Sequence, residues 1–186
     1  MRLRTKARSL GTVLAAALLA AGAALAGDPL KSGPQPGDRT NAFDVQDVTG
    51  PNKGKTLCYV CQNGARPVTL IFTREVNKEL AGLVKAVDAV HKDQKKAGAF
   101  VVLLEKDEKA GREKLAKLAA ETGASIPLTV NKLGEKSPDG YGLSPDVKNT
   151  ILIYKERKVV SNFALNAISE KDIKAIADAA KKNIAG

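Results

Sequence analysis

The chain has 186 residues, with 30 Lys and Arg against 20 Asp and Glu, and a net charge of +10 at pH 7. The cations are interleaved with acids, and the chain contains three Tyr, four Phe and no Trp. Nucleic-acid binding favours clustered basic residues with stacking aromatics, so we expect no nucleic-acid partner. Two cysteines do not form a disulfide framework, and a packed core must therefore supply the stability.

Residues 1–26 have the pattern of a secretory signal peptide. The first nine residues carry four cations and no acid, an apolar run follows, and Ala24-Leu25-Ala26 is a small-x-small cleavage pattern. We expect an exported protein, periplasmic or extracellular, of 160 residues with a net charge of +6 and one domain. The apolar run falls short of the about 20 strongly apolar residues of a membrane span, so no stable membrane insertion is expected after cleavage.

The next part of the chain predicts a leader and a hairpin. Residues 27–40 are rich in Pro, Gly and polar residues, which predicts a flexible leader. Residues 42–48 alternate apolar and polar side chains, as a half-buried strand does, and 55–60 predict a second strand. The turn residues of 49–54 join the two strands as a hairpin.

Two short apolar runs, 67–72 and 99–104, predict strands that are covered on both faces. Apolar residues at helical spacing lie between them and predict a helix that runs to about Lys96. We expect Thr73 to cap this helix and Gly98 to end it.

The second half of the chain continues the alternation. Asp107 and Gly123 bound a predicted helix over 108–121, and 126–130 predict a short strand. Residues 131–149 predict a long irregular loop.

A second hairpin and a helix close the chain. Residues 150–154 and 159–165 predict the two strands of the hairpin, and Ser169 with Asp172 predicts a capping box for a helix to about Asn183. Strands that alternate with helices predict an α/β class with a central mixed sheet flanked by helices.

Four stretches carry a family resemblance: NAFDVQDVTGPNKGKTL, RPVTLIFTRE, YGLSPDVKNTILIYKERKVV and ISEKDIKAIADAAKKNI. Together they resemble the thioredoxin-like superfamily, and most of all its redoxin branch of peroxiredoxins and TlpA-type secreted thiol–disulfide proteins. The resemblance implies a thioredoxin-like fold over residues 41–186 with an N-terminal β-hairpin extension.

The chain also departs from this family. The family's reactive cysteine follows the central strand at the start of the first long helix, where the helix N-terminus stabilises its thiolate. The corresponding stretch here is FTREVNKEL, which has no cysteine, and Asn149 stands where the family places a cis-proline. Peroxidase activity is therefore not expected, because the attacking cysteine is missing.

The two cysteines, Cys58 and Cys61, form a C-x-x-C motif before the central strand instead. In an extended strand their Cα atoms would lie roughly 10 Å apart, beyond the about 7 Å that a disulfide permits. A turn over 58–61 would allow the bond. Asn63-Gly64 also signals a tight hairpin turn, which would leave two separated thiols.

Several roles for Cys58 and Cys61 stay open. They can form a structural disulfide, exchange electrons as a catalytic redox pair, or bind a soft metal ion. No helix is predicted after the motif, so no helix dipole lowers the pKa of a thiol there. A zinc site lacks ligands, because the one histidine, His91, lies on a predicted helix, where we expect it at the surface. We expect no metal and no cofactor.

The sequence thus leads to two hypotheses of function. In the first, the protein is a thiol–disulfide oxidoreductase that acts on other exported proteins through Cys58 and Cys61, with Cys58 as the attacking residue by analogy of order. In the second, it is a non-catalytic binding or structural module with a Cys58–Cys61 structural disulfide and a binding surface on the loop 131–149.

Overall fold

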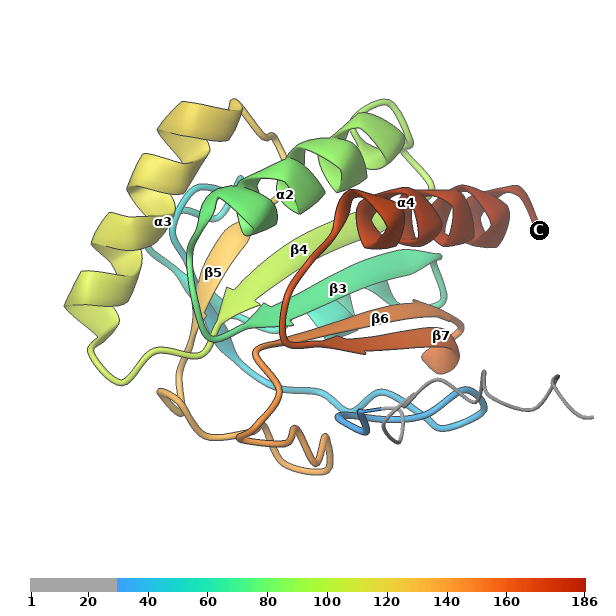
Figure 1. Ribbon diagram of the computed structural model, residues 1–186, viewed down its shortest axis with the longest axis horizontal. Helices are drawn as coiled ribbons and strands as arrows, with labels where there is room; N and C mark the ends of the chain where they lie inside the picture. Colours follow the sequence, from blue (N-terminus) through green and yellow to red (C-terminus); the bar gives the residue numbers. More distant parts are fainter. Residues whose placement is uncertain (1–29) are drawn as a thin grey trace, which may run out of the picture.

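The computed structural model describes residues 30–186, so the predicted signal peptide and the first residues of the predicted leader lie outside the described residues. These residues form one seven-stranded mixed sheet in the order β2-β1-β5-β4-β3-β6-β7, with four helices (Figure 1). The elements are β1 (Val45–Asp47), β2 (Thr56–Leu57), α1 (Tyr59–Asn63), β3 (Val68–Thr73), α2 (Lys78–His91), β4 (Gly98–Leu103), α3 (Glu108–Thr122), β5 (Leu128–Asn131), β6 (Asn149–Lys155), β7 (Lys158–Leu165) and α4 (Glu170–Ala185).

The centre of the sheet is formed by the strands that the apolar runs predict. β3 pairs in parallel with β4 and antiparallel with β6, and β4 pairs in parallel with β5. Every residue of β3 is buried, as expected for a strand that is covered on both faces. The predicted mixed sheet is thus confirmed.

The three long helices, α2, α3 and α4, cover one face of this sheet (Figure 1). They pack on alternate side chains of the strands, among them Ile71 and Val101, and Leu83, Leu115 and Ile176 are fully buried in this layer. The alternation follows from the strand period of two residues.

The opposite face carries a second cluster, made by the other set of strand side chains, including Leu70, Phe72 and Phe100. The short helix α1 covers part of it with Tyr59 and Val60. The loop between β5 and β6 contributes buried Tyr141 and Leu143 to the same cluster, so it belongs to the packed domain.

Most of the predicted helix ends are confirmed. The Asp107 side chain accepts hydrogen bonds from two backbone N–H groups at the start of α3, and Gly123 ends that helix in the left-handed region. Ser169 and Asp172 form the predicted capping box of α4.

The limits of α2 differ from the prediction. Asn77, rather than Thr73, is the N-cap, because its side chain accepts the Leu80 N–H at 2.9 Å. Thr73 is still the last residue of β3. The helix ends at His91, and Gly98 begins β4 instead of ending the helix.

The N-terminal hairpin is shorter than predicted. Each of its strands has only two or three residues, and the segment predicted as the strand 55–60 turns into α1 after Leu57. Residues 30–40, predicted as part of a flexible leader, lie against the domain instead. Ser32 is buried and contacts Thr150 at 2.6 Å, and Asn162 donates to the Ser32 and Pro34 carbonyls.

Within residues 30–186, no helix has the length and apolar character to cross a membrane.

Candidate functional site

Cys58 and Cys61 form a disulfide, with their Cα atoms 5.2 Å apart. The bond is possible because the chain turns into α1 at this point: Cys58 is the N-cap and Cys61 lies in the first turn. In a helical turn, residues three apart lie on the same face, within the Cα separation that a disulfide requires. The predicted strand, which would have separated the two sulfurs, ends at Leu57.

The same helix corrects two sequence-based expectations. A helix does begin at the motif, although it has only five residues, and the Cys61 N–H donates a hydrogen bond to Cys58 Sγ at 3.1 Å. Asn63-Gly64 does not form a hairpin turn. Asn63 is the last residue of α1, and Gly64 caps it with a positive φ of 57°. The hairpin signal is overruled because Tyr59 and Val60 bury themselves against the sheet in a helical conformation.

Tyr59 connects α1 to the end of β1 through a hydrogen bond. Its hydroxyl donates to Asp47 Oδ2 at 2.6 Å, and its ring packs at 5.3 Å from that of Phe100. Asp47 is 1 % exposed, and its carboxylate also accepts hydrogen bonds from the N–H groups of Gly50 and Asn52. Burial, followed by this hydrogen bond to Asp47, raises the pKa of Tyr59 above its ordinary value. Tyr59 therefore acts as a neutral donor that orients the disulfide-bearing helix.

The other end of α1 rests on the start of β4. The Asn63 side chain donates to the Tyr59 carbonyl at 2.9 Å. It also lies so close to Gly98 that a Cβ at that position would come within 2.2 Å of Asn63 Oδ1. Any larger residue at position 98 would force the Asn63 side chain to move.

The two cysteine residues differ in their exposure. Cys58 is half-buried and packs, with Phe43 and Leu57, against the cluster on this face of the sheet. Cys61, one turn along, is exposed. Cys61 is therefore the more exposed half of the disulfide.

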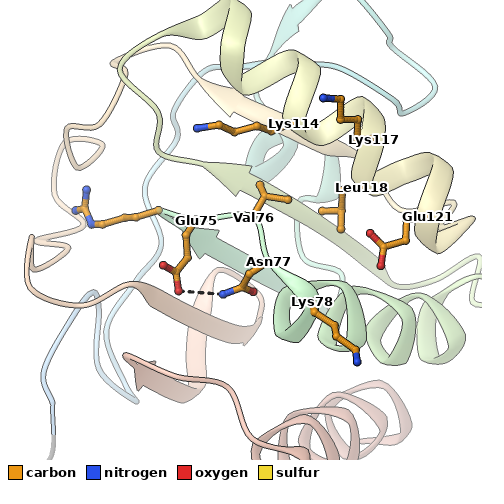
Figure 2. A pocket seen from close by; sticks show the side chains of 9 residues that line it. Glu75, Val76, Asn77, Lys78, Lys114, Lys117, Leu118 and Glu121 are labelled. Carbon is orange, nitrogen blue, oxygen red and sulfur yellow. Dashed lines mark hydrogen bonds between the residues drawn. The ribbon is translucent and has the colours of Figure 1, made fainter.

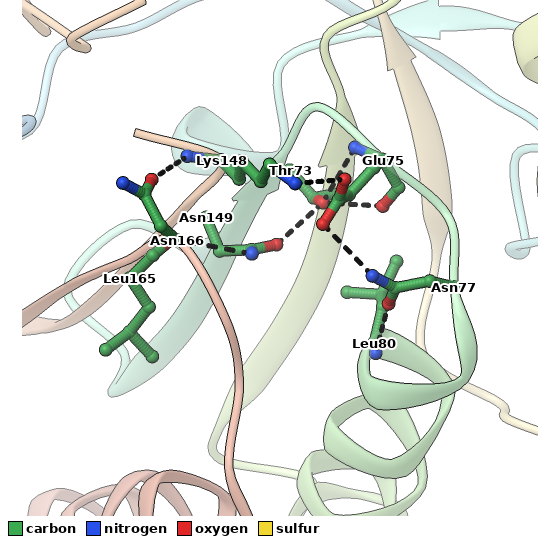
Figure 3. A network of polar contacts seen from close by, with 8 residues as sticks. All are labelled: Thr73, Glu75, Asn77, Leu80, Lys148, Asn149, Leu165 and Asn166. Carbon is green, nitrogen blue, oxygen red and sulfur yellow. Dashed lines mark hydrogen bonds and ion pairs between the residues drawn. The ribbon is translucent and has the colours of Figure 1, made fainter. Parts of the chain in front are cut away.

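A polar network lies between the end of β3 and the start of α2 (Figure 3). In the thioredoxin-like family that the sequence resembles, this position holds the reactive cysteine. Thr73 Oγ1 lies 2.8 Å from Asn149 Oδ1 and 2.8 Å from the Glu75 carbonyl. Asn77 donates to Glu75 Oε1 at 3.0 Å, and Lys148 forms an ion pair with Glu75 at 3.0 Å. None of the residues in this network is a cysteine, so the network has no thiol nucleophile. Residues 30–186 also contain no cis peptide bond.

A shallow groove of about 590 Å³ lies beside this network, between the start of α2 and the flank of α3 (Figure 2). Val76 and Leu118 form its apolar part, and Lys78, Lys114 and Lys117 are among its charged residues. No cysteine or histidine lines it. The groove thus offers binding contacts without a group for redox chemistry.

His91 is buried, contrary to the prediction of a surface residue. It is 6 % exposed, and its Nε2 lies 3.0 Å from Thr69 Oγ1. Burial lowers its pKa to about 4, and the charge of Asp88 opposes this shift. His91 is therefore a neutral core residue near pH 7, and within residues 30–186 no cluster of three potential metal ligands occurs.

No family model matches the sequence, and no curated protein matches it. Several solved structures match the fold. A protein disulfide isomerase candidate from Bacteroides thetaiotaomicron has a TM-score of 0.64 at 16 % identity, over 84 % of this chain and 96 % of that one. A candidate thiol:disulfide interchange protein DsbE from Chlorobium tepidum has a TM-score of 0.63 at 15 % identity, over 81 % and 98 %. Peroxidoxin BcpB from Mycobacterium tuberculosis has a TM-score of 0.59 at 20 % identity, over 81 % and 96 %.

These similarities confirm the thioredoxin-like fold that the sequence resemblance implies. At these identities they show the fold alone, and a fold does not determine an activity. The function of the protein is therefore decided by the residues of the site.

Proposed function

We propose that this protein is an exported thiol–disulfide oxidoreductase whose redox pair is Cys58 and Cys61. The observation that carries the proposal is the exposure of Cys61 within a disulfide whose other half, Cys58, is held on α1. Export rests on the signal-peptide pattern of residues 1–26 and places the pair in a compartment where disulfides persist.

The exchange begins when a partner thiolate attacks Cys61 Sγ. The partner–Cys61 bond forms, the Cys58–Cys61 bond breaks, and Cys58 leaves as a thiolate. The Cys61 N–H that already points at Cys58 Sγ stabilises this charge. A second partner thiolate then attacks the partner's own sulfur in the mixed disulfide, and Cys61 leaves as a thiolate. The partner dithiol is oxidised to a disulfide, and the pair, after protonation, is reduced to two thiols.

In this scheme Cys61, rather than the Cys58 expected from chain order, is the residue that bonds to the partner. Single variants test the assignment. In Cys58→Ser the free Cys61 should form a mixed disulfide with oxidised glutathione, and in Cys61→Ser the half-buried Cys58 should do so more slowly. Faster trapping at Cys58 would reverse the assignment.

The second hypothesis, a non-catalytic module with a structural disulfide, is favoured by one observation: Cys58 packs with Phe43 and Leu57 against the core. The loop 131–149, expected as its binding surface, is tied to the domain. Arg74 donates to its Glu135 and Ser144 carbonyls.

The reduction potential of the Cys58–Cys61 pair separates the two hypotheses. Thiol counting in glutathione buffers measures it in the purified protein. An exchange catalyst should have a reversible reduction potential between about −120 and −270 mV. A structural disulfide should have a potential below about −300 mV, so that glutathione hardly reduces it. A potential below about −300 mV would refute the proposed oxidoreductase function.

A further inference from the structure

The chain segment that carries the disulfide is basic. Between Val48 and Thr73 the chain carries Lys53, Lys55 and Arg66 and no Asp or Glu. All three cations are exposed. None of them takes part in an ion pair within the described residues. Their charges are therefore free to act on an approaching molecule.

Arg66 is held close to the redox pair. Its Nη2 donates to the carbonyl of Gln62, the residue after Cys61, at 2.7 Å, and its Nε donates to the Asn63 carbonyl at 3.2 Å. The guanidinium thus stays at the end of the same five-residue helix that carries the disulfide.

A second segment adds positive charge at this end of the sheet. The turn between β6 and β7 lies beside the α1–β3 loop, because the Glu156 N–H donates to the Ala65 carbonyl at 3.1 Å. The turn region carries Lys155, Arg157 and Lys158 against Glu156 alone.

Two acids of the β1 segment lie near α1. Asp47 is buried, with its carboxylate engaged by Tyr59 and backbone donors. Asp44 is exposed and, by the register of β1 with β2, lies opposite Cys58, so around the disulfide the cations outnumber the acids.

We propose that the substrate of the Cys58–Cys61 pair is a protein or peptide thiol with acidic residues beside its cysteine. This inference rests on the proposed function. A predominantly positive surface raises the local concentration of acidic partners, and with it the exchange rate, by about 10- to 1,000-fold, and it disfavours partners of like sign. The effect is screened once the Debye length falls to about 3 Å, near 1 M salt.

Three peptides test the proposal. Each has one cysteine in the same short sequence, flanked by Glu, Ser or Lys, and the second-order rate of opening the Cys58–Cys61 disulfide is measured by acid quench and mass spectrometry. Because flanking charges also change the peptide's own thiol pKa, each rate is divided by the rate of the same peptide with hydroxyethyl disulfide. The normalised rate should be at least about tenfold higher for the Glu peptide than for the Lys peptide at low salt, and nearly equal at 1 M salt.

A matched pair of variants locates the effect. Lys53→Glu with Lys55→Glu should abolish or reverse the preference. Lys85→Glu with Lys174→Glu, an equal change in net charge at exposed positions on α2 and α4, should leave it.

The outcomes separate the inference from the function on which it rests. Equal normalised rates for all three peptides, or a preference for the Lys peptide, would overturn the inference about acidic substrates. The proposed oxidoreductase function would be unaffected. No disulfide opening by any peptide would overturn the proposed function and the inference with it.

Discussion

Removal of the Tyr59 hydroxyl is expected to weaken the attachment of the disulfide-bearing helix. In Tyr59→Phe the ring keeps its packing against Phe100, but the buried Asp47 carboxylate loses one of its three hydrogen bonds. A hydrogen bond to a charged group contributes about 1.5–3 kcal/mol, so we expect the free energy of unfolding to fall by about 2 kcal/mol. The Gly50 and Asn52 N–H groups still satisfy part of the carboxylate, which keeps the loss near this value.

Tyr154→Phe is the matched control. Tyr154 is as deeply buried, but its hydroxyl has no hydrogen-bond partner among the described residues. Removing an unsatisfied buried hydroxyl loses no hydrogen bond and ends the cost of burying it. This variant should be neutral or more stable than the parent protein.

Urea unfolding followed by circular dichroism measures both variants. With a slope of about 2 kcal/mol per M for a domain of this size, Tyr59→Phe should shift the midpoint down by about 1 M. Tyr154→Phe should leave the midpoint unchanged or raise it. Equal losses in the two variants would refute the reasoning, because the Asp47 bond would then add nothing beyond the effect of deleting a buried hydroxyl.

The buried His91, the Gly98–Asn63 contact and the α4 cap each predict a measurable change in stability. The pKa of His91, lowered by burial to about 4 from 6.5, means that the unfolded chain takes up a proton first as the pH falls. On the order of 3 kcal/mol of stability should thus be present above pH 6.5 and lost as the pH falls towards 4. His91→Gln should show a flatter pH profile in urea titrations, and parallel profiles would argue against the assignment. Gly98→Ala should cost about 1–3 kcal/mol, and Asn63→Ala in the same chain should recover part of it, whereas simple additivity of the two losses would contradict the predicted clash. Ser169→Ala should lower the stability by about 1 kcal/mol through loss of the α4 cap, and an unchanged melting curve would show that the cap is dispensable.

The central strands and long helices were predictable because their signals are local. A continuous apolar run such as 67–72 is typical of a strand that is covered on both faces, and this pattern is visible without knowing which strands are its neighbours. Asp107 and Ser169 cap helices through side chains that reach backbone N–H groups two or three residues away. Such contacts need no information from the rest of the chain.

The candidate site was predictable only in part. The C-x-x-C spacing identified Cys58 and Cys61, and the missing cysteine after β3 was visible in the sequence. The Asp47–Tyr59 bond was missed, because it joins residues 12 apart and no spacing rule indicates it. The cap of α2 was misplaced because Thr73 and Asn77 are both good N-cap residues, and Thr73 is drawn into β3 and a contact with Asn149.

By itself, then, the sequence determined the alternation of strands and helices, the domain's thioredoxin-like character, and the identity of the two sulfurs. Tertiary structure decided that the sulfurs bond, that Cys61 is exposed, and that His91 is buried. The reason is that α1 has only five residues and too few internal hydrogen bonds to form alone. It exists because Tyr59 and Val60 bury themselves against the sheet and Asp47 accepts the Tyr59 hydroxyl, contacts that arise only once distant segments have come together.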